Sequence, residues 1–292
     1  MADIYGAVIG DIVGSYHEVL EMEWFTSKTI DADRRRSVLD KKTPLFSDKS
    51  SFTDDSILTC AVAKAILTDG DYEKSIRYYG LKEKDLGLDI YGRSKFGNGF
   101  INWLLGKEEY KSYGNGCAMR ISPVGYAFDT LEETLAEAEK SIVCSHGGED
   151  ALACGKAVAG AVFLARNGAS KEEIRQFAEG MIGKSLDYDL NDLTEKYYFK
   201  MKAINSVPEA IACFLQGNSF EDVLRKSISI GGDSDTIASI ACGIAGAYYE
   251  IPANIKREAG AFITGEYREI LDKFNEVFVR GDSYAEKDNS VR

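Results

Sequence analysis

Two short segments of the sequence combine pairs of carboxylates with hydroxyl groups. The first is Thr53-Asp54-Asp55-Ser56, and the second is the run Gly-Gly-Asp-Ser-Asp-Thr at positions 231–236. Each leads into a stretch rich in small apolar residues, so each is expected at the first turn of a helix. Such residues are common helix N-caps, and acids suit the positive end of the helix dipole. One acid per helix would serve that purpose, whereas each segment has two.

Considered together, the two segments indicate a cation site. Helices with alanine- and glycine-rich surfaces can pack closely, which would bring together the carboxylates of Asp54, Asp55, Asp233 and Asp235. Two like charges about 4 Å apart repel by roughly 4 kcal/mol at an effective dielectric constant of about 20, so this convergence requires cations. Oxygen ligands without histidine or cysteine favour Mg²⁺ or Mn²⁺ over zinc. A pair of such ions can orient a substrate and activate a water molecule.

A third segment near the N-terminus has a glycine at every fourth position. Gly6, Gly10 and Gly14 leave one helical face nearly bare, so another backbone can pack against it. This packing accounts for the glycines, and we interpret Asp11 as a structural residue that is hydrogen-bonded within the core. Glu18 lies just beyond and could reach a metal or a water molecule, although its spacing alone does not select it.

A glycine-rich loop, Lys-Ser-Tyr-Gly-Asn-Gly, occupies positions 111–116. Its Gly-Asn-Gly triplet permits positive φ angles and close backbone approach, as phosphate cradles require. The spacing fits neither a Walker A loop nor a dinucleotide fingerprint, and an ordinary tight turn is the alternative interpretation. Tyr113 could stack on a base. His146 lies between two helical patterns, where it is either a structural residue or a ligand contact.

The elements that must position these residues are predicted to be helices. Capping patterns at Thr130 and Ser170 each predict the start of a helix, and Ser206 with Pro208 predicts a third that Gly217 can end. There is no convincing run of alternating strands and no repeat of solenoid length. The expected fold is therefore a single all-α domain.

Two polar, glycine-containing segments, 27–51 and 80–116, are interpreted as long loops, which in compact domains are usually functional. The domain is expected to span residues 1–285, followed by a polar C-terminal tail at 286–292. Its apolar stretches are too short to span a bilayer, and no basic segment followed by an apolar core opens the chain, so neither a membrane nor a secretory signal is expected.

Composition narrows the classes of partner. The 292 residues carry a formal net charge of −12, and their longest basic run is three arginines, so nucleic acid is a poor candidate partner. A phosphate-bearing ligand would have to be held locally, by metal ions and backbone N–H groups. The six cysteines include no C-x-x-C pair and are best explained as free thiols in a reducing cytoplasm, and we expect a monomer.

Taken in order, these segments resemble the ADP-ribosylglycohydrolase family, also called ADP-ribosyl-acceptor hydrolases. The resemblance runs from about residue 5 to about residue 250 and includes the N-terminal glycine segment, both acidic segments, the 112–120 loop and His146. It implies an all-α, orthogonally packed fold around a two-magnesium centre, with Mn²⁺ as the alternative ion. The combination of motifs is much more specific than any single one.

The resemblance also implies roles for individual residues. The implied metal ligands are Glu18, Thr53, Asp54, Asp55, Asp233, Asp235 and Thr236. The implied contacts to ADP-ribose are Ser112, Tyr113, Gly114, Asn115, Gly116 and His146. The residues expected to act in catalysis are Glu18, Asp54 and Asp55, with Glu18 positioning or deprotonating water or passing a proton to the leaving group. Cys117 and Lys111 depart from the usual pattern and could alter substrate fit without removing a metal ligand.

The expected reaction is hydrolysis of the bond between ADP-ribose and an acceptor, through an oxocarbenium-like state that nearby negative charge favours. The acceptor stays open among arginine, serine, a nucleobase, O-acetyl-ADP-ribose and poly(ADP-ribose). Three alternatives also stay open: a non-catalytic protein that binds ADP-ribose, a structural relative similar to certain lens crystallins, and a metal-dependent phosphoesterase.

Overall fold

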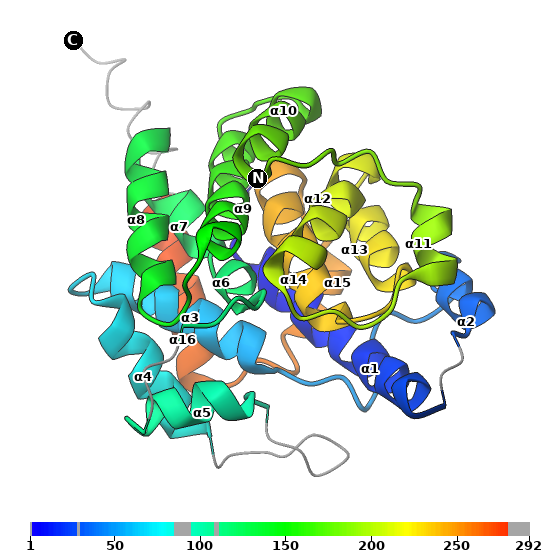
Figure 1. Ribbon diagram of the computed structural model, residues 1–292, viewed down its shortest axis with the longest axis horizontal. Helices are drawn as coiled ribbons and strands as arrows, with labels where there is room; N and C mark the ends of the chain where they lie inside the picture. Colours follow the sequence, from blue (N-terminus) through cyan, green and yellow to red (C-terminus); the bar gives the residue numbers. More distant parts are fainter. Residues whose placement is uncertain (1, 28–29, 85–94, 108–110, 280–292) are drawn as a thin grey trace.

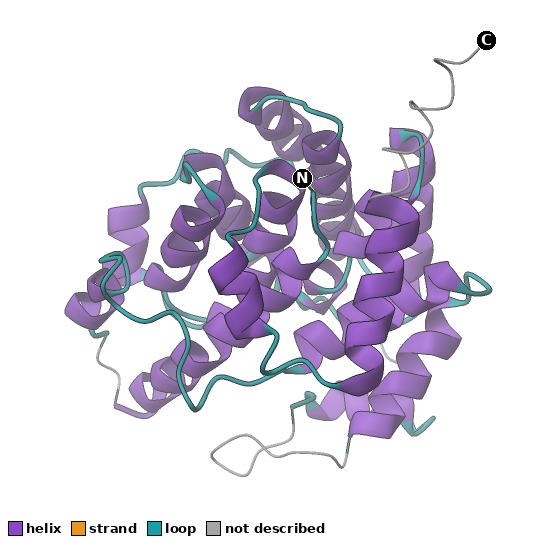
Figure 2. Cartoon of the chain, turned by 180° about the vertical axis from the view of Figure 1, so that it is seen from behind, coloured by secondary structure: helices purple, strands orange, loops and turns teal. Residues whose placement is uncertain are grey.

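The structure is a computed structural model that describes residues 2–27, 30–84, 95–107 and 111–279. Over these ranges the chain is all-α, as predicted, and its only extended pairings are two isolated bridges, Ser112 with His146 and Gly114 with Lys202. The helices run in several directions rather than as one parallel bundle (Figure 1), and where the structure describes the connections between them, these are loops and turns (Figure 2). None of the described helices is long and apolar enough to cross a membrane.

The longer helices begin and end as follows: α1 (Tyr5–Ser27), α3 (Asp54–Leu67), α4 (Tyr72–Glu83), α8 (Leu131–Val143), α9 (Glu149–Arg166), α10 (Lys171–Ile182), α12 (Val207–Gln216), α13 (Phe220–Ser229), α14 (Ser234–Tyr248) and α16 (Gly265–Phe274). The shorter ones are α2 (Ala32–Ser37), α5 (Asn98–Leu104), α6 (Gly116–Met119), α7 (Ser122–Ala127), α11 (Leu190–Lys196), α15 (Ala253–Ala259), the 3₁₀ turn η1 (Ala203–Asn205) and the π-helical turn η2 (Asn275–Val279).

Close packing of α1 against α14 forms the centre of the fold. The bare face predicted for Gly6, Gly10 and Gly14 lies directly on α14, where a Cβ on any of them would collide with backbone. The backbone residues met are, in turn, Cys242, Ala238 and Ser234, so the two helices run antiparallel. This direction places the N-terminus of α14, with its acidic pair, beside the middle of α1.

The predicted helix starts are confirmed. The side chain of Thr130 accepts the backbone N–H of Glu133 at 3.2 Å, and Ser170 forms a complete capping box with Glu173. Ser206 occupies the N-cap position of α12 and Gly217 its C-cap position, but the Ser206 hydroxyl donates to the Lys202 carbonyl at 3.2 Å and caps no helix N–H. The capping bonds at Thr130 and Ser170 join residues within one turn of each other, so local sequence is sufficient to identify these two caps.

The prediction of two long loops is partly wrong. Segment 27–51 contains α2, and segment 80–116 contains the end of α4, α5 and the start of α6. The Asn-Gly pair that begins α5 suggests a turn, but Phe100 and Trp103 of that helix are buried, with ring centroids 5.3 Å apart. Burial of two aromatic side chains outweighs the low helix propensity of glycine and asparagine. The predicted polar tail, 286–292, lies outside the described residues.

Candidate metal centre and substrate site

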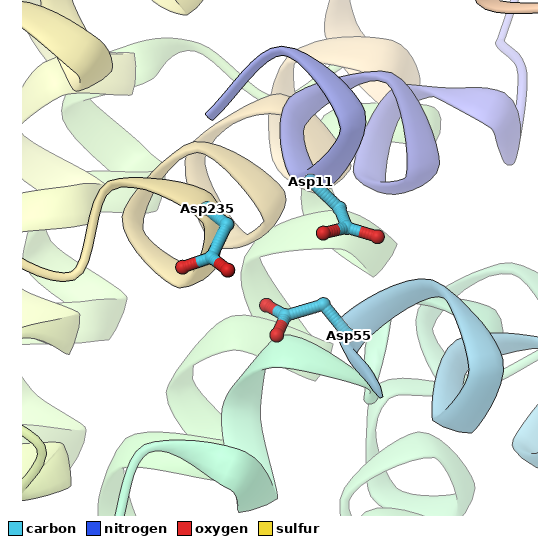
Figure 3. Close-up of side chains that lie close together, drawn as sticks. All are labelled: Asp11, Asp55 and Asp235. Carbon is cyan, nitrogen blue, oxygen red and sulfur yellow. The ribbon is translucent and has the colours of Figure 1, made fainter. Parts of the chain in front are cut away.

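Three helices bring one carboxylate each to a common point. Asp11 of α1, Asp55 of α3 and Asp235 of α14 point toward one another (Figure 3), and one oxygen from each lies within 4.8 Å of the other two. All three side chains are buried, with exposed fractions of 0%, 2% and 5%. The predicted convergence of the α3 and α14 N-termini is therefore confirmed, with α1 as the helix between them.

A second group of acids adjoins the first. Glu18, Asp233 and Asp235 also offer carboxylate oxygens that lie within 4.8 Å of one another. Asp235 belongs to both groups, whereas Asp55 and Glu18 each belong to one. Two adjoining sets of oxygen donors that share one carboxylate are the type of arrangement that can hold a pair of cations.

Asp11 connects α1 to the start of α3. Its carboxylate accepts the backbone N–H groups of Thr53 at 3.0 Å and Ser56 at 3.2 Å. It also accepts both hydroxyl groups, with the Thr53 bond at 2.5 Å. Burial raises the pKa of Asp11, and these hydrogen bonds oppose that shift. Asp11 is thus hydrogen-bonded within the core as predicted, but it also lies in the acidic group, which the sequence pattern did not indicate.

Asp55 carries a carboxylate oxygen without a hydrogen-bond donor. Its Oδ2 accepts the Thr236 hydroxyl at 3.4 Å, whereas its buried Oδ1 has no hydrogen-bond partner among the described residues. Burial, followed by the charges of Asp11 and Asp54, raises the pKa of Asp55 well above its usual range. A buried carboxylate oxygen with no donor, surrounded by other acids, fits a hard divalent cation, because the cation supplies the missing positive charge.

Asp54 lies beside this cluster rather than within it. Its carboxylate belongs to neither group of closely spaced oxygens, although desolvation and the Asp11 charge raise its pKa to about 8. The structure therefore brings together Asp55, Asp233, Asp235 and Glu18 from the predicted ligand set, with Asp54 at the edge.

Asn115 links the glycine-rich loop to the acidic cluster. Its side-chain amide donates to Asp233 Oδ2 at 2.7 Å. Asp233 follows a turn in which Gly231 and Gly232 both have φ angles of +75°, a conformation that strongly favours glycine. At Gly232 a Cβ would lie 2.6 Å from the Tyr197 ring. The turn that aims Asp233 at Asn115 therefore requires glycine for both its φ angle and its space.

The loop itself is held by backbone hydrogen bonds on two sides. The N–H of Ser112 donates to the Ser145 carbonyl at 3.0 Å, and that of Asn115 donates to the Met201 carbonyl at 2.8 Å. Neither Gly114 nor Gly116 has a positive φ, so the loop does not use the conformational freedom that its sequence permits. The glycines allow close approach instead. The expected phosphate cradle stays a prediction.

Of the two remaining predicted substrate contacts, His146 adjoins this loop and Tyr113 is part of it. A Cβ on Gly116 would lie 3.2 Å from Nε2 of His146, which is buried. Burial, followed by the positive charges of Arg120 and Lys111, holds the pKa of His146 well below its usual range, so the ring is neutral. Tyr113 covers Gly148 while 60% of its own surface is exposed. An exposed aromatic ring beside the loop is free to stack on a ligand.

Comparison with known proteins gives a consistent assignment. The family model described as ADP-ribosylglycohydrolase matches residues 2–283. The ADP-ribosylhydrolase ARH3 of Mus musculus is 25% identical over 88% of this chain and 86% of its own length. The ADP-ribosylarginine hydrolase Tri1 of Pseudomonas putida strain GB-1 is 21% identical over 85% of this chain and 70% of its own length. A solved structure titled "ADP-ribosylglycohydrolase-related protein complex" shares the fold, with a TM-score of 0.64, 21% identity and coverage of 93% of each chain.

Proposed function

Because the chain belongs to the ADP-ribosylglycohydrolase family, we propose that it is a metal-dependent hydrolase that releases ADP-ribose from an acceptor group. The observation that carries this proposal is the pair of buried acidic groups that share Asp235. A module that only binds ADP-ribose has no need for so many converging carboxylates. The hydrogen bond from Asn115 to Asp233 supports the proposal further, because it joins the expected substrate loop to the acids.

The oxygen donors around Asp235 are proposed to hold two divalent cations, with Mg²⁺ expected and Mn²⁺ as the alternative. The proposed ligands are Asp11, Glu18, Thr53, Asp54, Asp55, Asp233, Asp235 and Thr236. The unpartnered Asp55 Oδ1 is the atom that most requires such an ion. When bound, these cations supply positive charge that holds ribose hydroxyl groups and lowers the pKa of a nearby water molecule.

The chain's own residues have separate tasks in the proposed reaction. Glu18 is only partly buried, so it is accessible to position and deprotonate the attacking water. The 112–116 loop and His146 hold the ADP-ribose moiety, which fixes the reacting C1 atom near the acids. The negative charge of the surrounding aspartates favours the oxocarbenium-like state that develops at C1. Asp54, at the edge of the cluster, is proposed to contact substrate.

The identity of the acceptor group is left to experiment. One of the relatives is described as an ADP-ribosylarginine hydrolase and others as ADP-ribosylhydrolases, so their descriptions do not select one linkage. We propose that segments 27–51 and 80–110, which carry none of the proposed ligands, determine acceptor choice.

The test is release of ADP-ribose from arginine-linked and serine-linked ADP-ribosyl peptides, in Mg²⁺, in Mn²⁺ and in EDTA. We expect release with metal from at least one peptide, and loss of that release in EDTA or in Asp235→Asn. The matched control is Asp187→Asn, which makes the same change at an exposed aspartate and should leave release unchanged. No release from either peptide, by protein that binds both metal and ADP-ribose, would rule out these two linkages and favour a binding protein or another of the open acceptors, and no release from any of the open acceptors would contradict the proposal.

A further inference from the structure

Arg120 is a buried cation without an acidic partner. Its side chain has no exposed surface and forms no ion pair with any described residue. Its Nη2 donates to the Ser141 carbonyl at 3.1 Å and to the Ser145 hydroxyl oxygen at 2.7 Å. The Ser141 carbonyl belongs to the last turn of α8, whose partial negative charge offsets part of the guanidinium charge. Burying a charge in this way is costly, so it calls for an explanation.

Ser145 connects this arginine to His146. The fully buried Ser145 Oγ lies 3.0 Å from Nδ1 of His146. A serine hydroxyl has a single proton, and its oxygen here already accepts from Arg120. The proton is therefore directed to Nδ1, because the other side-chain contact of this hydroxyl among the described residues, the Cys144 sulfur at 3.9 Å, is a thiol that donates toward the serine oxygen and is at best a weak acceptor.

The opposite arrangement leaves polar groups unsatisfied. If His146 carried its proton on Nδ1, the two lone pairs of the Ser145 oxygen would accept from Arg120 and from His146. The serine hydroxyl proton would then have no strong acceptor in a buried site, which costs about 1–3 kcal/mol. The donors and acceptors available around Ser145 thus favour one tautomer of the neutral His146 ring, with Nδ1 as acceptor and the proton on Nε2.

The protonated nitrogen lies at the substrate loop. Nε2 is the ring atom nearest to the Cβ position of Gly116, and no described residue hydrogen-bonds to it. The charged groups that act on the ring are Arg120 and Lys111, both cationic, and both disfavour a doubly protonated imidazolium. A neutral ring with a free Nε2–H is a hydrogen-bond donor suited to a phosphate or ribose oxygen.

We propose that Arg120 and Ser145 are positioning residues that fix His146 as the neutral Nε2–H tautomer, so that the ring donates a hydrogen bond to an oxygen of ADP-ribose beside Gly116. This inference rests on the proposed function, because it takes ADP-ribose as the ligand of the 112–116 loop. It also gives the buried guanidinium of Arg120 a function, whereas the roles predicted for the other site residues do not account for that charge.

The tautomer can be measured directly, because the chain contains only two histidines. Protein with ¹⁵N-labelled histidine is examined by long-range ¹H–¹⁵N correlation spectroscopy in Mg²⁺ buffer, and His146→Gln identifies which signals belong to His146. We expect a protonated Nε2 and an unprotonated Nδ1 in the ligand-free wild-type protein. A protonated Nδ1 in this spectrum overturns the proposal without any positioning variant being needed.

Two serine variants then separate positioning from general packing. Ser145→Ala removes the hydroxyl that directs the tautomer, so the Nδ1–H form should become detectable. Ser141→Ala is the matched control, because Arg120 contacts the Ser141 carbonyl while the Ser141 hydroxyl has no partner among the described residues. Its spectrum should match that of the wild type. Equal changes in both variants, or no change in Ser145→Ala, overturn the proposal.

Binding of ADP-ribose completes the test. Addition of ADP-ribose should shift the Nε2 signal more than the Nδ1 signal, and Ser145→Ala should weaken binding measured by calorimetry by about threefold to tenfold, the worth of one hydrogen bond. An unmoved Nε2 signal in ADP-ribose-saturated protein overturns the proposal. Absence of peptide hydrolysis, with the expected tautomer and Nε2 shift, contradicts only the proposed hydrolase activity.

Discussion

Asp11 of α1 accepts the backbone N–H of Thr53 at 3.0 Å, so a side chain from one helix caps the start of another. The same carboxylate lies within 4.8 Å of carboxylate oxygens of Asp55 and Asp235. The contact that joins α1 to α3 therefore also sets the position of Asp55 relative to α14. The packing of α1 against α3 and the assembly of the acidic site therefore depend on the same side chain, Asp11.

The capping role of Asp11 predicts a large effect on stability. Asp11→Ala leaves four donors on Thr53 and Ser56 without their acceptor, and relief of repulsion among the acids offsets only part of this cost. We expect the free energy of unfolding to fall by about 3 kcal/mol. Urea denaturation measures it, with Ser170→Ala, the cap of the exposed end of α10, as a control expected to cost about 1 kcal/mol. Equal costs for both variants would refute the role of Asp11.

The glycine contact between α1 and α14 predicts a second effect. A Cβ on Gly14 would lie 2.5 Å from the Asp235 Cα, so Gly14→Ala must push the two helices apart and displace Asp235. We expect a loss of about 1–3 kcal/mol in stability, together with weaker metal binding. Gly180→Ala in α10 is the control, because nothing lies within 4 Å of its Cβ position, and it should stabilise the protein by about 0.5–1 kcal/mol. If Gly14→Ala left both the stability and metal binding unchanged, this result would contradict the close packing of α1 on α14.

The helices could be predicted from sequence where their signals are local. The side-chain caps at Thr130 and Ser170 act within one turn, and α8, α10 and α12 each begin directly after the residue that the sequence indicates. Helix α5 was missed because its Asn-Gly start resembles a turn. Its formation depends on burial of Phe100 and Trp103, and such tertiary packing is not visible in a short window of sequence.

The acidic site was only partly predictable for the same reason. Paired acids at two helix starts indicated that Asp55 and Asp235 converge, and the structure brings them together. The partners of Asp11 lie 42 and 45 residues further along the chain, so no local pattern could identify them. Arg120 and Ser145 were missed because their significance depends on burial and on a hydrogen bond between the end of α8 and the segment after α6.

Glu209 of α12 predicts a pH dependence of stability that is independent of the metal centre. Its side chain is only 6% exposed, and its Oε2 has no partner among the described residues. Burial raises the pKa of Glu209 above the usual value of 4.5, so the folded protein holds this proton more strongly than the unfolded chain. The stability contributed by protonated Glu209 is present below about pH 4.5 and is lost as the pH rises through the folded-state pKa.

Glu209→Gln removes this titration while keeping the size of the side chain. We therefore expect the stability of the variant, relative to the wild type, to increase as the pH rises above about 4.5 and to level off once the pH exceeds the folded-state pKa of Glu209, as measured by chemical denaturation. Glu250→Gln, at an exposed position, is the control and should show a constant difference over the same range. If the stability difference between Glu209→Gln and the wild type did not change with pH, the Glu209 carboxyl group would have the same pKa in the folded and unfolded protein, which would contradict this prediction.

The central claim is that two acidic groups sharing Asp235 hold the cations on which ADP-ribose release depends. The most direct measurement titrates metal-free protein with Mg²⁺ or Mn²⁺ and records bound ions and release rate on the same samples. We predict two ions per wild-type chain, a partial loss of ion binding in Asp55→Asn and in Glu18→Gln, and loss of both ions and of release in Asp235→Asn. Undiminished release by metal-free wild-type protein, or by Asp235→Asn, would contradict the account.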